Sequence, residues 1–126
     1  MQQQRGPAFR RALLIEPQAL FAPYFVATLQ SSGLDVVMVA KRPGTVDIRA
    51  FGPDIVFVDA AHHPVAPLRS IRALRRAAPY AHIVVYAAIA EGVVWHALAR
   101  SIGADVVVSG RAGERDLIRA LVAERP

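Results

Sequence analysis

The sequence predicts an α/β fold in which a five-stranded parallel sheet carries helices on both faces. Three observations lead to this prediction. Five short apolar runs, rich in β-branched residues, alternate along the chain with five runs of helical periodicity. Short loops join these runs, and glycine or proline stands at several of their boundaries. The chain shows no internal repeat, linker or low-complexity segment, so a single domain accounts for the pattern.

The strand-like runs are short and apolar, as expected for parallel strands that helices cover on both faces. In chain order they are Arg11–Ile15, Asp35–Val39, Ile55–Asp59, His82–Tyr86 and Asp105–Val108. The helix-like runs that follow them are Gln18–Ser31, Val46–Phe51, Pro67–Ala77, Glu91–Ile102 and Gly113–Ala123. Glycine and proline mark boundaries at Gly33, Gly52-Pro53, Pro79 and Gly103. Right-handed crossovers between successive strands then leave few possible topologies.

Composition indicates a globular domain preceded by a flexible N-terminal arm. Of the 126 residues, 54% are hydrophobic and 20% are charged, and residues 11–126 suffice for one core. Residues 1–10 are polar with glycine and proline, and we expect them to form the arm. No apolar run approaches the ~20 residues that span a bilayer, and nothing in Met1–Arg11 resembles a signal peptide, so we expect a cytoplasmic protein without membrane contact. The absence of cysteine excludes disulfides, thiolate metal sites and thiol nucleophiles.

The basic charge of the chain has two interpretations. The net charge is +5, and all but one of the basic residues are arginine. A basic surface attracts nucleic acid or acidic proteins, yet the arginines are scattered and few aromatic residues lie among them. Arg69, Arg72 and Arg76 fall opposite the apolar side of the predicted helix 67–77, as in an ordinary solvated face. We therefore do not expect nucleic acid to be a partner of this domain alone.

A carboxylate ends the third predicted strand. The run Ile55–Asp59 is apolar until its last residue, and the carboxyl ends of strands are where open α/β sheets hold ligands and catalytic groups. Asp59 therefore suggests a phosphoryl-acceptor site. The structural alternative is that its carboxylate bonds to N–H groups of a loop or pairs with an arginine.

Several segments resemble the receiver domain of two-component response regulators, in the family's order and spacing over residues 11–123. They are Leu13–Glu16, Pro53–Asp59, the helix positions Leu68, Ile71, Leu74 and Arg75, and the turn Gly103–Asp105. The resemblance implies the flavodoxin-like (βα)5 receiver fold and places Asp59 at the phosphoryl-acceptor position. It also implies a Mg²⁺ site formed by the Glu16 and Asp59 carboxylates and the backbone carbonyl of Ala61.

Other positions depart from the family's pattern. Pro17 replaces the second acid after the first strand, Ala87 the hydroxyl residue that ends the fourth strand, and Gly110 the lysine that ends the fifth. Val107 stands at the position of the aromatic switch residue. Because phosphoryl transfer depends on positioning and charge neutralisation, we expect a pseudo-receiver: no enzyme activity of its own, phosphorylation lost or strongly weakened, and a weak or absent Mg²⁺ site. The alternative is a functional Mg²⁺-dependent receiver that a histidine kinase phosphorylates on Asp59.

The predicted helix 91–102 is apolar around much of its circumference. Val94, Leu98 and Ile102 form one stripe, which Trp95 widens. In the receiver family this helix, the fifth strand and the fifth helix commonly form a signalling or dimer face. We therefore expect a protein partner, an output domain of the same protein or a second copy of the chain to bind there. Packing of Trp95 onto the sheet is the alternative. Through contacts at this face, we expect the domain to act as a regulator, as the N-terminal part of a longer transcriptional or signalling protein.

Overall fold

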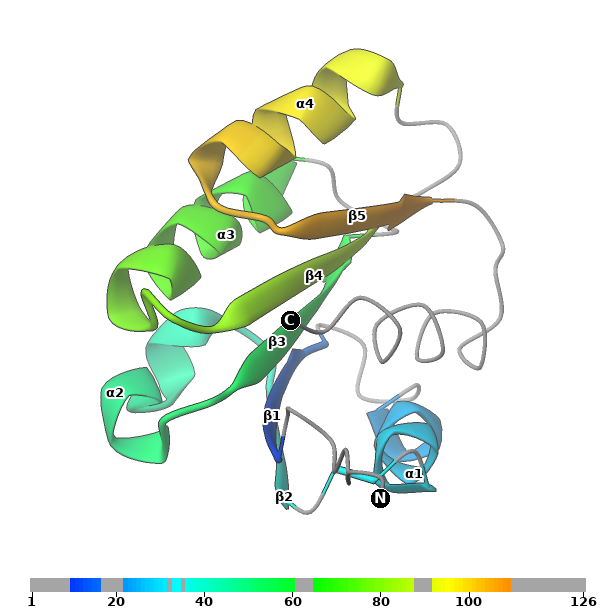
Figure 1. Ribbon diagram of the computed structural model, residues 1–126, viewed down its shortest axis with the longest axis vertical. Coiled ribbons are helices and arrows are strands. Elements are labelled where there is room, and N and C mark those ends of the chain that lie inside the picture. Colours follow the sequence, from blue (N-terminus) through cyan, green and yellow to red (C-terminus); the bar gives the residue numbers. More distant parts are fainter. Residues whose placement is uncertain are drawn as a thin grey trace, which may run out of the picture.

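A parallel sheet of five strands forms the centre of the molecule (Figure 1). The computed structural model describes residues 10–16, 22–31, 33–34, 36–60, 65–87 and 92–109. The strands are β1 (Arg11–Ile15), β2 (Val36–Ala40), β3 (Ile55–Ala60), β4 (His82–Ala87) and β5 (Val106–Ser109). They lie in the order β2-β1-β3-β4-β5, and every neighbouring pair is parallel. This confirms the predicted sheet, and the order is that of flavodoxin-like folds.

The strand boundaries agree with the sequence pattern to within one residue. β1, β3 and β4 begin at the predicted residues. β2 and β5 lie one residue further along, because the ladder pairs Ala40 with β1 and Ser109 with β4. Asp105 precedes β5, and its carboxylate accepts a hydrogen bond from the N–H of Ile83 at 2.8 Å. Asp105 therefore caps the start of the ladder instead of belonging to the strand.

Helices cover both faces of the sheet, as predicted. They are α1 (Ala22–Ser31), α2 (Ile48–Phe51), α3 (Val65–Ala77) and α4 (Val93–Ile102), with a 3₁₀ helix, η1, at Pro43–Thr45. α1 lies on one face, and α2, α3 and α4 lie together on the other (Figure 1). α2 begins later than predicted, because the Asp47 carboxylate accepts the N–H of Ala50 at 3.1 Å and caps the helix there. The predicted helix 113–123 and the start of the predicted helix 18–31 lie outside the described residues.

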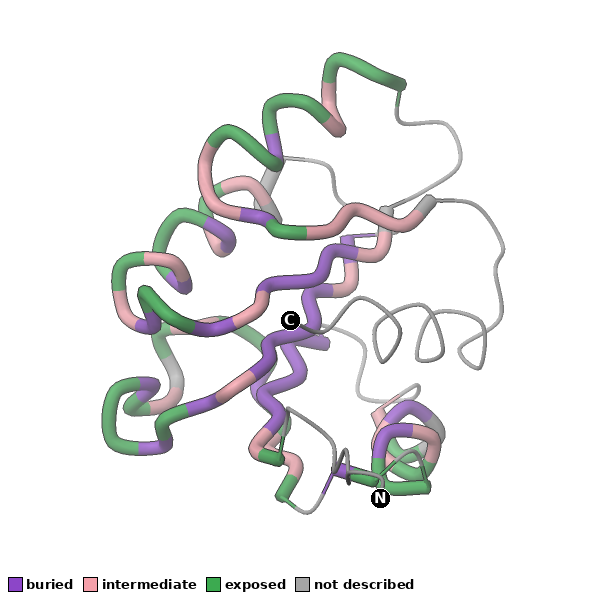
Figure 2. The backbone as a smooth tube through the Cα atoms, viewed as in Figure 1, coloured by how far each residue is buried: buried purple, intermediate pink, exposed green. Residues whose placement is uncertain are grey.

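Alternation along the strands forms one core on each side of the sheet. Figure 2 shows that the central strands are buried, whereas the helices carry exposed residues as well. The cluster on the α1 side contains Ala12, Leu14, Phe25, Leu29, Leu34, Ile55, Phe57 and Val84. The three-helix cluster, on the side of α2, α3 and α4, includes Leu13, Ile15, Ile48, Phe51, Val56, Val58, Ile71, Leu74, Ile83, Val85 and Ala99. Because β1 and β3 contribute to both clusters, they are buried along nearly their whole length. None of the described helices has the length and apolar character needed to cross a membrane.

The guanidinium group of Arg75 joins the end of α3 to the amino ends of β4 and β5. Its Nη1 donates hydrogen bonds to the carbonyls of Pro79 and Ala81 at 3.0 and 2.8 Å. Nε and Nη2 both donate to the carbonyl of Gly103, at 3.1 and 2.7 Å. Nη2 also lies 2.7 Å from the Asp105 carboxylate. One side chain therefore fixes the turn after α3, the end of α4 and the start of β5.

Gly103 ends α4 in a backbone conformation that L side chains rarely adopt. Its φ is +141°, and a Cβ at this position would lie 2.8 Å from the Cβ of Arg75. Glycine is therefore required both by the turn and by the close approach of α3. The sequence pattern predicts a boundary at this glycine, and the contact with Arg75 supplies a second reason for it.

Replacing Arg75 with alanine should destabilise the domain by about 2–4 kcal/mol, because several carbonyls and the Asp105 carboxylate would lose their charged donor. Urea unfolding followed by circular dichroism measures this change. Arg72→Ala is the matched control: Arg72 is exposed on the same helix, and its loss should change the unfolding free energy by less than about 0.5 kcal/mol. Equal unfolding free energies for the two variants would contradict the role assigned to Arg75.

Candidate functional site

Two acidic residues stand at the carboxyl edge of the sheet, where its winding reverses. β1 lies between β2 and β3, so the chain leaves β1 toward one side of the sheet and leaves β3 toward the other. Open α/β sheets bind ligands at this switch point. Glu16 follows β1 directly, and Asp59 belongs to the end of β3. Since Ile15 pairs with Val58, the two acids occupy the next level on neighbouring strands.

The strand alternation directs Glu16 and Asp59 to the same face of the sheet. Leu14 and Phe57, two residues earlier on their strands, belong to the cluster on the α1 side. Side chains two positions apart on a strand point the same way, and Glu16 continues the ladder through its N–H, which donates to the carbonyl of Ala40 at 2.9 Å. The structure thus brings together the two acids that the sequence selects.

Glu16 is the more buried of the two acids. Its exposed fraction is 1%, and no other charged residue in the described part of the chain is buried. Asp59 is half-buried. Charged residues are almost never fully buried unless they are paired, because removing an ionised carboxylate from water is unfavourable. The edge therefore carries an acid whose position is not explained by packing of apolar side chains.

Tyr86 is a further residue of this edge, and the sequence analysis missed it. The ladder between β3 and β4 places Tyr86 directly opposite Asp59. The tyrosine is half-buried and packs against the cluster on the α1 side, so its ring lies on the face to which Asp59 points. The signal in the sequence was its place at the end of the run His82–Tyr86, in phase with the buried Val84. A phenol is thereby brought beside the acceptor position.

The positions that depart from the receiver pattern are only partly described. Ala87 ends β4 in register with Ser109, which brings a hydroxyl residue to the end of β5 that the sequence analysis did not consider. Val107 packs against the three-helix cluster. Two other predicted site positions, Pro17 and Gly110, lie outside the described residues.

Among the described residues, two side chains at this edge can bind a divalent cation. Glu16 and Asp59 are carboxylates at adjacent positions, whereas Ala61, the third predicted ligand, lies outside the described residues. Among the residues that the structure describes, no group of three or more histidine, cysteine, aspartate or glutamate side chains is arranged to hold a metal ion. Mg²⁺ can be held by one or two carboxylates together with waters and phosphate oxygens. The two carboxylates present therefore fit a cation that is also bound by waters or phosphate oxygens better than a cation bound by protein ligands alone.

The predicted stripe on α4 divides between surface and core. Val94 is 82% exposed and Leu98 is 45% exposed. Trp95 and Ile102 are instead half-buried and pack against the three-helix cluster. Val93, which the sequence analysis did not select, is 84% exposed and adjoins Val94. The exposed apolar surface of α4 therefore consists of Val93, Val94 and Leu98.

Comparison with known proteins identifies the fold. No family model and no curated protein matches the chain. A CheY-like response regulator receiver domain protein from Methanospirillum hungatei is 13% identical with a TM-score of 0.77, covering 93% of this chain and 94% of that one. A LuxR-family two-component response regulator from Aurantimonas sp. is 22% identical with a TM-score of 0.74, covering 94% and 88%. A protein from Burkholderia pseudomallei described as related to pilus assembly is 18% identical with a TM-score of 0.76, covering 99% and 98%.

These similarities show that the chain has the fold of response regulator receiver domains. The predicted fold class is thereby confirmed. One of the similar structures carries a description from pilus assembly instead of phosphoryl signalling, which agrees with the general rule that a fold alone does not define a function.

Trp95→Ala should destabilise the domain by about 2–3 kcal/mol, because removal of the half-buried ring leaves space against the three-helix cluster. Val94→Ala, one residue earlier and largely exposed, should change the unfolding free energy by less than about 0.5 kcal/mol. Urea unfolding followed by circular dichroism compares the two variants. If they unfold at the same urea concentration, the Trp95 ring does not contribute to the core.

Proposed function

We propose that this chain is a pseudo-receiver, a cytoplasmic signalling domain that acts through protein contacts and not as an enzyme, with aspartyl phosphorylation lost or strongly weakened. A mismatch within one site carries the proposal. Glu16 and Asp59 occupy adjacent positions at the switch point, while Pro17, Ala87 and Gly110 stand where the receiver pattern has the groups that assist the acceptor.

Each of these three residues lacks a group that phosphoryl transfer requires. The transferred group carries negative charge that must be neutralised and held in line. Pro17 offers no side-chain oxygen to a cation, Ala87 offers no hydroxyl to a phosphoryl oxygen, and Gly110 offers no ammonium group. A hydrogen bond to a charged group contributes ~1.5–3 kcal/mol, so the combined loss corresponds to roughly three orders of magnitude or more in rate.

We do not expect this domain to hold a cofactor tightly. Where Mg²⁺ binds, Glu16 and Asp59 would hold it, and it would neutralise charge on a phosphoryl group. Glu16 is almost fully buried and Asp59 is half-buried. An ion from solvent would therefore reach the pair chiefly through Asp59. We infer weak binding of the ion.

The partner proposed for this domain is a protein. Val93, Val94 and Leu98 form an exposed apolar surface on α4, and adjacent exposed apolar side chains are typical of contact surfaces. Trp95 supports this surface from below through its contact with the three-helix cluster. A second copy of the chain, an output domain of the same protein or a separate regulator would bury these side chains.

Incubation with acetyl phosphate and Mg²⁺ tests the proposed loss of phosphorylation. We expect intact-mass spectrometry to find little or no adduct of about 80 Da, because the charge-neutralising groups are replaced. Asp59→Asn serves as the control, since it removes the acceptor and keeps the shape of the side chain. A substantial adduct on the unchanged chain that is absent from Asp59→Asn would refute the pseudo-receiver.

The alternative function is a Mg²⁺-dependent phosphoacceptor that a histidine kinase phosphorylates on Asp59. The adjacent register positions of Glu16 and Asp59 favour it. Tyr86, directly opposite Asp59 on β4, supplies a polar group beside the acceptor position. The same mass measurement separates the two functions, because only this alternative gives an Asp59-dependent adduct.

Leu98→Glu should weaken self-association through α4 by at least about tenfold, since a charge would enter the apolar surface. Sedimentation equilibrium over a range of protein concentrations measures the association. Arg100→Gln is the matched control, because it also lowers the net charge by one and lies on an exposed side of the same helix. A dimer that is unaffected by Leu98→Glu, or equally affected by both changes, would show that the copies do not meet at this surface.

A further inference from the structure

The three helices on one face of the sheet carry positive charge without any acidic residue. α2, α3 and α4 contain six arginines and no aspartate or glutamate. Arg75 is engaged by backbone carbonyls and by Asp105. The five remaining arginines are exposed, and together they are named the basic face: Arg49, Arg69, Arg72, Arg76 and Arg100.

The described acids do not neutralise the basic face. Asp54 and Asp105 lie at the amino edge of the sheet and accept hydrogen bonds from backbone N–H groups at strand starts. Glu16 and Asp59 lie at the opposite, carboxyl edge. Asp47 caps the start of α2. Within the described part of the chain, none of the five arginines of the basic face forms an ion pair, so their charges are available to an external anion.

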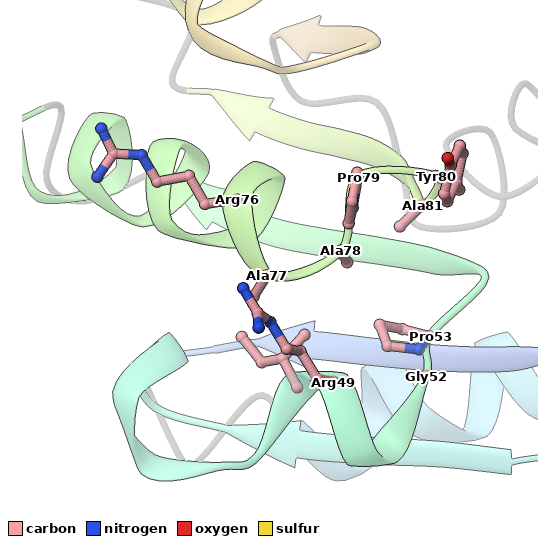
Figure 3. Close-up of a pocket in the computed structure, with 10 residues that line it drawn as sticks. Arg49, Gly52, Pro53, Arg76, Ala77, Ala78, Pro79, Tyr80 and Ala81 are labelled. Atoms are coloured by element: carbon pink, nitrogen blue, oxygen red, sulfur yellow. The ribbon is translucent and has the colours of Figure 1, made fainter.

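An open groove adjoins the basic face between the end of α2 and the turn after α3 (Figure 3). Its volume is about 370 Å³, and Arg49, Pro53, Arg76, Ala78 and Pro79 contribute to its lining. Arg49 extends from α2 toward the end of α3 in Figure 3, and the two prolines lie on the α2 and α3 sides of the groove. Tyr80, which also lines it, is 99% exposed. The groove is thus largely apolar and has cationic and aromatic groups at its rim.

The turn that forms one side of the groove is held in place from behind. Nη1 of Arg75 donates to the carbonyls of Ala78, Pro79 and Ala81 at 3.4, 3.0 and 2.8 Å. These three carbonyls of the turn are therefore satisfied within the protein, and the apolar atoms around them remain for a ligand. A groove fixed in this way loses little conformational entropy when it is filled.

We propose that the groove and the basic face bind an acidic segment of a partner protein, with one large apolar or aromatic side chain seated in the groove. Arg69, Arg72 and Arg76 follow one another at spacings of three and four residues, which places their Cβ atoms ~5–6 Å apart along one side of the helix. Acidic side chains on one face of an extended peptide repeat every ~6–7 Å, a similar interval. The segment would therefore run along α3 and place its apolar residue beyond Arg76, in the groove.

The apolar groove favours a protein segment over nucleic acid as the occupant. A phosphodiester backbone gains from the arginines but has no apolar side chain to place between Pro53 and Pro79. The groove lies at the amino edge, away from Asp59, so the proposed seating of an apolar side chain there does not depend on whether Asp59 is phosphorylated.

Fluorescence anisotropy with the full chain and labelled peptides tests the proposal. The probes are a peptide of alternating glutamate and serine with one central tryptophan, the same peptide with alanine in the centre, and a lysine counterpart of the first. We expect the acidic tryptophan peptide to bind about tenfold more tightly than the alanine peptide, the lysine peptide not to bind, and binding to weaken steeply as salt is raised. Equal binding of the tryptophan and alanine peptides, or no binding at low salt, would overturn the proposal.

Charge-reversal variants locate the site. Arg49→Glu combined with Arg76→Glu should weaken binding of the acidic tryptophan peptide by more than about tenfold. Lys41→Glu combined with Arg42→Glu changes the net charge by the same amount. These two residues follow β2, at the carboxyl edge and away from the groove, so this change should weaken peptide binding by less than about threefold. Circular dichroism checks that each variant folds. If the glutamate pair at Arg49 and Arg76 does not fold, Arg49→Gln combined with Arg76→Gln replaces it. Equal losses in both double variants would contradict the assigned site.

Random duplex DNA and phosphatidylserine vesicles serve as competing probes. We expect neither to displace the acidic tryptophan peptide at physiological salt. Displacement by either probe at a comparable concentration of charge would identify a general polyanion surface instead of a peptide site.

Discussion

The guanidinium group of Arg75 is the contact on which the arrangement of α3, α4 and β5 depends. The Arg75 side chain is only 26% exposed, so its charge is balanced chiefly by carbonyl dipoles and by Asp105. Because the carbonyls come from separate segments, none of these segments can move alone without leaving a polar group unsatisfied. Gly103 extends this constraint to α4, since it ends that helix at the distance where only a glycine fits beside Arg75. The position of α4 over the sheet follows from this contact.

The described acids at the two edges of the sheet have different physical roles. At the amino edge, the Asp54 carboxylate accepts two backbone N–H groups at the start of β1, at 2.8 and 2.9 Å, and Asp105 accepts one at the start of β4. These acids satisfy donors that the ladder leaves open, and so they stabilise the fold. Glu16 and Asp59 lie at the carboxyl edge, beyond the apolar levels of β1 and β3. Strand capping does not require these two acids to occupy adjacent positions at the switch point.

Most of the fold and half of the candidate site could be predicted from sequence, because both depend on local pattern. Apolar runs place the strands, and the strand end places Asp59 at the edge. Tyr86 was missed because its position beside Asp59 depends on the register between two strands, which no local pattern contains. Helical periodicity gives the angle of Trp95 around α4 but not how the helix lies on the sheet. That depends on Arg75 and Gly103, whose contact joins residues distant in sequence.

The separation of the two edges explains how a receiver fold can keep its stability while the groups around its acceptor change. The contacts of Arg75 and Asp105 that hold α3, α4 and β5 together lie at the amino edge. Pro17 and Gly110 come directly after Glu16 and Ser109 in the sequence, outside the residues that the structure describes. A changed charged or hydroxyl group around Asp59 would leave these amino-edge contacts in place, as the proposed pseudo-receiver requires. The groove lies at the amino edge, so the binding proposed there does not depend on the chemistry that Asp59 retains.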